Sequence, residues 1–146
     1  MNYRKLGKTG LTVSEIGFGG EWMDGTPEEA LAVVRAAQDA GINILDCWQW
    51  VIQGHLGSVT HDGQYMRTRD LDLVKPAFED LLARFHTDYM DLGMIHYVDK
   101  PTEFEEIAAG SPFMGYIREL KRAGTVRHIG LSTHNPEVAR LAVENP

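Results

Sequence analysis

Polar side chains with acid–base chemistry follow several buried, strand-like segments of the sequence. Asp46 follows "INIL", His55 follows "VIQG" and His96 follows "LGMI". The carboxyl ends of parallel strands meet at one edge of a sheet, so we expect these side chains to converge on one pocket. A carboxylate beside two imidazoles would form a set that transfers protons, because burial and proximity tune each pKa.

Two further strand ends carry groups that could bind a ligand. "EIGFGG" ends in Gly20, Glu21 and Trp22, and "IGL" ends in Ser132 and Thr133. Every single residue also has a structural interpretation, since polar residues at strand ends often cap the next helix and lone histidines are often structural. The hypothesis of a site therefore depends on the set and not on one member.

A metal-dependent hydrolase is the sharpest competing interpretation, because barrel hydrolases also gather His and Asp at strand ends. Such enzymes commonly carry an H-x-H pair on the first strand, which "EIGFGG" lacks. We expect no metal site. "GFGGEW" is not a G-x-G-x-x-G dinucleotide fingerprint either, because Trp22 stands at the third glycine position.

The elements that must position these groups alternate along the chain. Thr26, Pro27 and Glu29 form a capping box that opens a helix, and the apolar strand "INILDCW" follows it. Ser111-Pro112 and Asn135-Pro136 open later helices in the same way. This β–α–β rhythm predicts a parallel sheet buried on both faces.

The segments between "WVIQGHL" and "LGMI", and after "LGMI", are less regular. "GSVTHDGQYMRTR" is expected to be a polar loop, and Pro76 predicts a kink or a restart in the helix that follows. "TEFEEIAAG" indicates a helix with a capping box made by Thr102 and Glu105.

The fold class is therefore α/β, with residues 1–146 forming one partial (β/α) barrel of about five βα units. The turn "GKTG" predicts a short β-hairpin over residues 1–14. "INILDCW" and "WVIQGHL" are almost contiguous, whereas a parallel crossover needs about a dozen residues. We therefore expect a deletion at residues 48–49 that removes the second helix. A complete barrel takes about 250 residues, so the N-terminal part is expected here.

Composition narrows the classes of partner. The chain has 146 residues, of which 43% are hydrophobic and 24% charged, with a formal net charge of −7. The negative charge gives no electrostatic support for nucleic-acid binding, and no apolar run is long enough to cross a bilayer. One cysteine, Cys47, and the lack of a signal-peptide pattern favour the cytoplasm.

The order of four segments resembles the aldo-keto reductase superfamily: "YRKLGKTGLTVSEIGFGG", "AGINILD", "LLARFHTDYMDLGMIHYVD" and "IRELKRAGTVRHIGLSTHN". The resemblance implies a (β/α)8 barrel and hydride transfer between NADP(H), less often NAD(H), and a small carbonyl or alcohol. It assigns Asp46 and His96 to the active-site Asp and His, and Ser132 to a serine that helps hold the nicotinamide amide. Thr133 stands where the family usually has Asn. The loop that passes near cofactor and substrate is formed by Gly20, Glu21 and Trp22.

Two departures from the family pattern concern the proton donor. His55 stands at the position of the family's lysine, and "DCWQWV" lacks the tyrosine that protonates the carbonyl. We expect His96 to donate a hydrogen bond to the substrate oxygen and His55 to take over part of the tyrosine's role. "NILDCW", "IQGH" and "MIHYVD" are most similar to a branch whose full chains carry an iron–sulfur segment. A cluster needs about four cysteines and would require a longer chain.

Three functions remain open at this point. The first is an oxidoreductase of the aldo-keto reductase type, and the second is a non-catalytic part-barrel that acts as an interaction module. The third is the metal-dependent hydrolase. Open strand edges are pairing templates, so we expect them to favour self-association.

Overall fold

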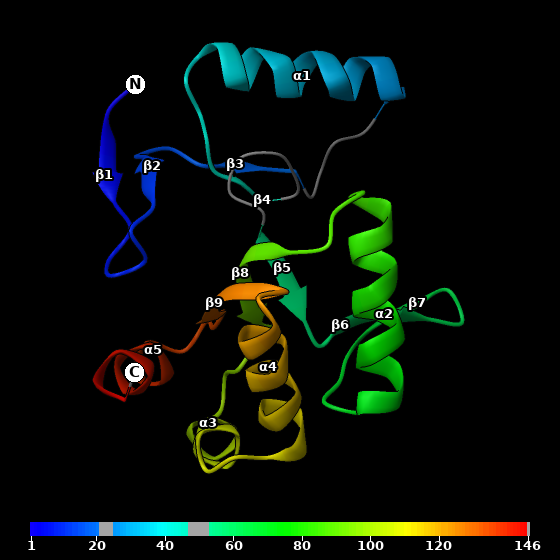
Figure 1. Ribbon diagram of the computed structural model, residues 1–146, viewed down its shortest axis with the longest axis vertical. Helices are drawn as coiled ribbons and strands as arrows, with labels where there is room; N and C mark the ends of the chain where they lie inside the picture. Colours follow the sequence, from blue (N-terminus) through cyan, green and yellow to red (C-terminus); the bar gives the residue numbers. More distant parts are fainter. Residues whose placement is uncertain (21–24, 47–52, 146) are drawn as a thin grey trace. The chain divides into compact units, whose positions relative to one another are not determined.

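The computed structural model describes residues 1–20, 25–46 and 53–145 of the chain (Figure 1). Its contacts divide the chain into two compact units, Met1–Gln53 and Gly54–Pro146, which are described separately. The expected deletion at residues 48–49 lies outside the described residues. None of the helices in these ranges has the length and apolar character that crossing a bilayer requires.

The first unit holds a hairpin and one β–α–β unit. β1 (Tyr3–Lys5) pairs antiparallel with β2 (Thr12–Ser14), as "GKTG" predicts. β3 (Phe18–Gly19) pairs parallel with β4 (Leu45–Asp46), and α1 (Pro27–Asp39) connects them. Thr26 and Glu29 form the expected capping box at the start of α1.

The second unit is built on a three-stranded sheet in the order β5–β8–β9. Its strands are β5 (Gln53–Leu56), β8 (Met90–Ile95) and β9 (Val126–Leu131). β8 and β9 run parallel, as the sequence predicts. α4 (Pro112–Ala123) packs against β9 (Figure 1), and its buried residues are Phe113 and Ile117. The largest fully buried side chains of this unit include Leu56, Met90, Phe113, Ile117 and Val126.

The second unit has three other helices in the described range: α2 (Leu71–Arg84), α3 (Pro101–Ala108) and α5 (Pro136–Glu144). α2 continues through Pro76 as one helix, so a restart there is wrong. Pro76 lies in the second turn, and the carbonyl that it leaves without a donor belongs to the exposed Asp72, where water can bind it.

The capping box predicted for α3 is also wrong. Pro101 is the first residue of α3, and its N-cap, Lys100, makes no side-chain hydrogen bond. Pro101 favours the first helical position, so the helix begins before Thr102 could cap it. By contrast, Ser111 and Asn135 both accept a hydrogen bond from the first turn of the helix that they cap.

The segment expected to be a polar loop is a β-hairpin instead. β6 (Ser58–His61) pairs antiparallel with β7 (Gln64–Arg67), beside α2 (Figure 1). Asp62 and Gly63 connect the strands with positive φ angles of 50° and 72°. This two-residue connection has the signs of a type I′ turn, whose twist matches the strands and which Asp-Gly favours. The Asp-Gly pair is the sequence signal that the polar composition concealed.

Candidate active site

His55, His96 and Tyr65 form a continuous chain of polar contacts. Nδ1 of His55 lies 2.7 Å from Nδ1 of His96, and the Tyr65 hydroxyl contacts Nε2 of the same His96 ring. The two histidines that were expected to converge therefore lie side by side. Tyr65 was not among the sequence candidates, because nothing local in the sequence connects it to a strand end.

Adjacent strands position the two imidazoles. His55 lies in β5, and His96 directly follows β8, the neighbouring strand of the sheet. The His96 N–H donates to the Leu56 carbonyl oxygen at 2.9 Å, which continues the strand pairing past the end of β8. The ring centroids are consequently only 4.9 Å apart.

The hairpin register brings Tyr65 to the same place. Tyr65 stands opposite Thr60, and Arg67 stands opposite Ser58, so Tyr65 and Arg67 share one face of the hairpin. Val59 projects from the other face, where it is buried. Nη1 of Arg67 donates to the Tyr97 carbonyl oxygen at 2.7 Å, which attaches this face to the segment after β8.

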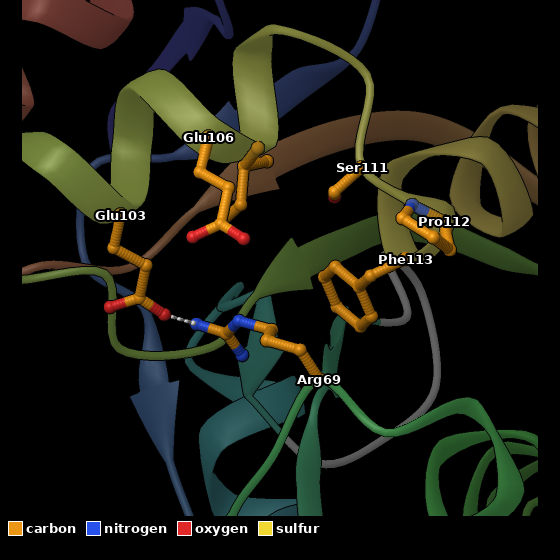
Figure 2. A pocket seen from close by; sticks show the side chains of 7 residues that line it. Arg69, Glu103, Glu106, Ser111, Pro112 and Phe113 are labelled. Atoms are coloured by element: carbon orange, nitrogen blue, oxygen red, sulfur yellow. Dashed lines mark ion pairs between the residues drawn. The ribbon is translucent and has the colours of Figure 1, made fainter.

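Arg69 also secures the backbone of His96. Its Nη2 donates to the His96 carbonyl oxygen at 2.6 Å and forms an ion pair with Glu103 at 3.0 Å. Figure 2 shows the guanidinium pointing toward Glu103, with the Phe113 ring beside it; the Cζ-to-centroid distance is 5.1 Å. These groups line a cavity of about 230 Å³. Within the described part of the chain, Nε of Arg69 is buried without a hydrogen-bond partner.

Gly57 permits this close approach of Arg69. A Cβ atom at Gly57 would lie 2.5 Å from Nη1 of Arg69 and 2.6 Å from the Thr68 carbonyl oxygen. Its φ of +90° also disfavours any side chain. A glycine at the start of the hairpin is therefore a condition for the Arg69 contact with His96.

The His96 ring is neutral at neutral pH. Burial, together with the nearby His55 and Arg69, lowers the pKa of His96 from 6.5 to about 4. A neutral imidazole carries one N–H and one acceptor nitrogen. In the chain of contacts, His96 therefore donates on one side and accepts on the other.

Ser132 lies beside the His96 segment. Its hydroxyl oxygen accepts a hydrogen bond from the Tyr97 N–H at 2.8 Å, and its backbone pairs with Ile95 and Val98. Tyr97 has a φ of +54°, a left-handed conformation that is rare for an aromatic residue. The contacts of Ser132 and Arg67 hold this unfavourable backbone in place.

Thr133, a predicted cofactor contact, makes its described side-chain hydrogen bonds within the turn after β9. Its hydroxyl donates to Asp99 at 3.0 Å, and the same carboxylate oxygen accepts from the His134 N–H at 2.7 Å. The His134 hydrogen bond is the main cause that lowers the pKa of Asp99. Thr133 and Asp99 thus organise the turn between β9 and α5.

The remaining predicted residues belong to the first unit. Gly20 follows β3, and Asp46 ends β4 opposite Gly19, although the Asp46 side chain is outside what the structure describes. Glu21 and Trp22 lie outside the described residues. In ranges 1–20, 25–46 and 53–145, no group of three or more His, Cys, Asp or Glu side chains could hold a metal ion.

Parallel strands, connecting helices and polar groups at the strand ends define a protein of the (β/α)-barrel class. The structure of aldo-keto reductase AKR11C1 from Bacillus halodurans, in its holo form, matches with a TM-score of 0.79 at 24% identity. The match covers 99% of this chain and 54% of that one, and it supports the fold.

Sequence comparisons identify the family. Two relatives from Bacillus subtilis (strain 168) are each 26% identical: the uncharacterized oxidoreductase YqkF and the aldo-keto reductase YhdN. The alignments cover 99% and 94% of this chain but only 53% and 48% of the relatives. The model of the aldo/keto reductase family matches residues 60–145. The chain belongs to the aldo/keto reductase family and spans about half the length of these relatives.

Proposed function

We propose that the protein is an oxidoreductase that transfers hydride between NAD(P)(H) and a small carbonyl or alcohol. The observation that carries this proposal is the contact of His96 with both His55 and Tyr65. A carbonyl that gains a hydride must also gain a proton at oxygen, and these three groups can supply one. Membership of the aldo/keto reductase family supports the same reaction class.

The Ser132 hydroxyl supports a contact with the carboxamide of a nicotinamide ring. Ser132 accepts from Tyr97 and can still donate its own hydroxyl proton, which suits the oxygen of a carboxamide. We assign Ser132 to this contact; the family resemblance adds Gly20, Glu21, Trp22, Asp46 and Thr133 as predicted site residues. When bound, NAD(P)H would supply the hydride. The preference for NADP(H) and the cytoplasmic location rest on the family resemblance and on the cysteine content.

The experiment uses the full-length gene product. NADPH and NADH oxidation is followed at the nicotinamide absorbance band with 4-nitrobenzaldehyde as the probe substrate. His96→Ala should lower kcat by about 10²–10⁴-fold, the usual effect of removing an acid–base group. His86→Asn is the matched control, because His86 is exposed and Asn tolerates its φ of +49°.

Three results would count against the proposal. Wild-type turnover that persists in His96→Ala would remove His96 from the site. A protein that binds neither nucleotide would support the interaction module. Ester hydrolysis that requires added metal would support the hydrolase instead.

A further inference from the structure

We propose that Tyr65 is the proton donor to the substrate oxygen and that His96 and His55 form a relay that reprotonates it. This inference rests on the proposed oxidoreductase function. It assigns the proton donor to a hairpin strand, whereas the family pattern places a tyrosine shortly after Asp46, where "DCWQWV" has none. It also replaces the expectation that His55 itself takes the tyrosine's role.

The order of contacts determines which group faces the substrate. Tyr65 contacts only one side of the His96 ring, through Nε2, while His55 contacts the other side through Nδ1. The Tyr65 residue is 62% exposed, so a small molecule can approach its hydroxyl. His55 and His96 are half-buried behind it. Tyr65 is therefore the exposed member of this chain of contacts.

The protons can be followed atom by atom. In the resting arrangement, His55 donates its Nδ1–H to Nδ1 of His96, and His96 donates its Nε2–H to the Tyr65 oxygen. The Tyr65 O–H then points outward, and its proton forms a bond with the negatively charged substrate oxygen. As the Tyr65 O–H bond breaks, the phenolate oxygen takes the His96 Nε2 proton, and His96 Nδ1 takes the His55 Nδ1 proton. His55 gains a proton from solvent water at Nε2, which leaves hydroxide in the solvent; the chain is then neutral, with each histidine in its other tautomer.

The relay works only if His96 stays neutral. A doubly protonated His96 would donate at both nitrogens and could not accept from His55. The burial and the neighbouring Arg69 that lower the pKa of His96 to about 4 remove this obstacle at neutral pH. Arg69 contributes in a second way, because its hydrogen bond to the His96 carbonyl oxygen fixes the backbone that carries the ring.

The hairpin supplies a defined geometry for the donor. Antiparallel pairing with β6 and the contact of Arg67 with Tyr97 hold β7 at both its edge and its end. A shift of one residue in the β6–β7 pairing would turn Tyr65 to the opposite face. The position of the Tyr65 phenol therefore depends on the register of the hairpin. A tyrosine at an arbitrary surface position would not depend on it in this way.

Tyr65→Phe in the full-length protein is the central test, with Tyr97→Phe as its matched control. Both variants lose one phenol hydroxyl and keep an aromatic ring near His96. We expect Tyr65→Phe to lower kcat by about 10²–10³-fold with unchanged NADPH binding by titration calorimetry, and Tyr97→Phe to stay within about twofold. In wild type, several protons move together. A plot of kcat against the D2O fraction should therefore be curved. His55→Ala removes one of these protons and should reduce the curvature.

A measurement without turnover tests the contact itself. In protein labelled with ¹⁵N at histidine, the His96 Nε2 resonance should shift in Tyr65→Phe and remain in place in Tyr97→Phe. Identical His96 spectra in wild type and Tyr65→Phe would overturn the relay. Wild-type-like kcat in Tyr65→Phe, in an active enzyme, would also overturn the relay while leaving the oxidoreductase function intact. A shifted resonance in a protein that oxidises neither NADPH nor NADH would overturn the function and, with it, the role of the relay.

Discussion

The hydroxyl of Tyr65 contacts Nε2 of His96, although the two residues are 31 positions apart and are positioned by different sheets. Tyr65 lies in a two-stranded hairpin, and His96 follows the central strand of a three-stranded sheet. The candidate site is thus a junction of two elements. Each element can be perturbed separately, and this makes the following predictions specific.

The turn of the hairpin should control activity from a distance. Gly63 has a φ of +72°, and a Cβ there would meet no atom within 4 Å, so only backbone strain opposes a side chain. We expect Gly63→Val to destabilise the protein by about 1–2 kcal/mol and to lower kcat by displacing Tyr65. Asp62→Asn is the control, because Asn tolerates a positive φ. Urea unfolding measures the stability, and steady-state kinetics measure kcat. Equal activity of the two variants would show that the turn does not affect the site.

Arg69 should affect the titration of His96 through its charge and the position of His96 through its geometry. Arg69→Leu removes a nearby positive charge, so the pKa of His96 should rise toward its ordinary value. Arg69→Lys keeps the charge but loses the planar fork, so the pKa should stay low while kcat falls. NMR titration of His96 distinguishes the two. Arg122→Leu, on the exposed side of α4, should change neither quantity.

The stability of the fold should depend on pH through His96. Because the folded pKa is about 4 and the unfolded value is 6.5, the unfolded chain binds more protons between these values. The free energy of unfolding should therefore decrease as pH falls from 6.5 to 4. Below pH 4, His96 should cause no further decrease. His96 is partly solvated, so the total should be on the order of 1 kcal/mol. His96→Asn should remove this slope in urea unfolding at pH 7 and pH 5; an unchanged slope would contradict the assignment.

The 146-residue chain by itself should bind cofactor weakly and self-associate. β9 is an edge strand of the three-stranded sheet in the described part of the chain, and open edges are pairing templates. The chain spans about half the length of its relatives. Loss of a few charge-assisted contacts that a full-length protein would make to the nucleotide, at about 1.5–3 kcal/mol each, would weaken binding by orders of magnitude. Calorimetric titration with NADPH and NADH, beside sedimentation of the same sample, tests both. Micromolar binding by a monomer would contradict this prediction.

The sequence predicts the helices well where a local signal is strong. Thr26-Pro27, Ser111-Pro112 and Asn135-Pro136 each combine a capping side chain with a proline, and each opens a helix in the structure. Thr102 failed as a cap because Pro101 before it is the stronger start signal. Parallel pairing of β8 with β9 follows from the β–α–β order.

The site was only half predictable, for a physical reason. His55 and His96 follow apolar strands, so position along the chain indicates where they meet. Tyr65 lies in a strand that is exposed along its whole length and lacks the apolar alternation that marks strands in a sequence. Only Asp62-Gly63 signals the hairpin, and nothing in its composition indicates that it reaches His96. The contact depends on tertiary packing.

The Asp62-Gly63 hairpin also has a consequence for folding kinetics. Its strands are neighbours in the sequence, and hairpins of this kind close in about 1–10 μs. β8 and β9 are separated by two helices, and non-local parallel pairing forms far more slowly. The β6–β7 hairpin that carries Tyr65 would therefore form before β8, the strand that precedes His96, pairs with β9. In refolding experiments, recovery of activity should follow assembly of the sheet, with hairpin closure finished long before.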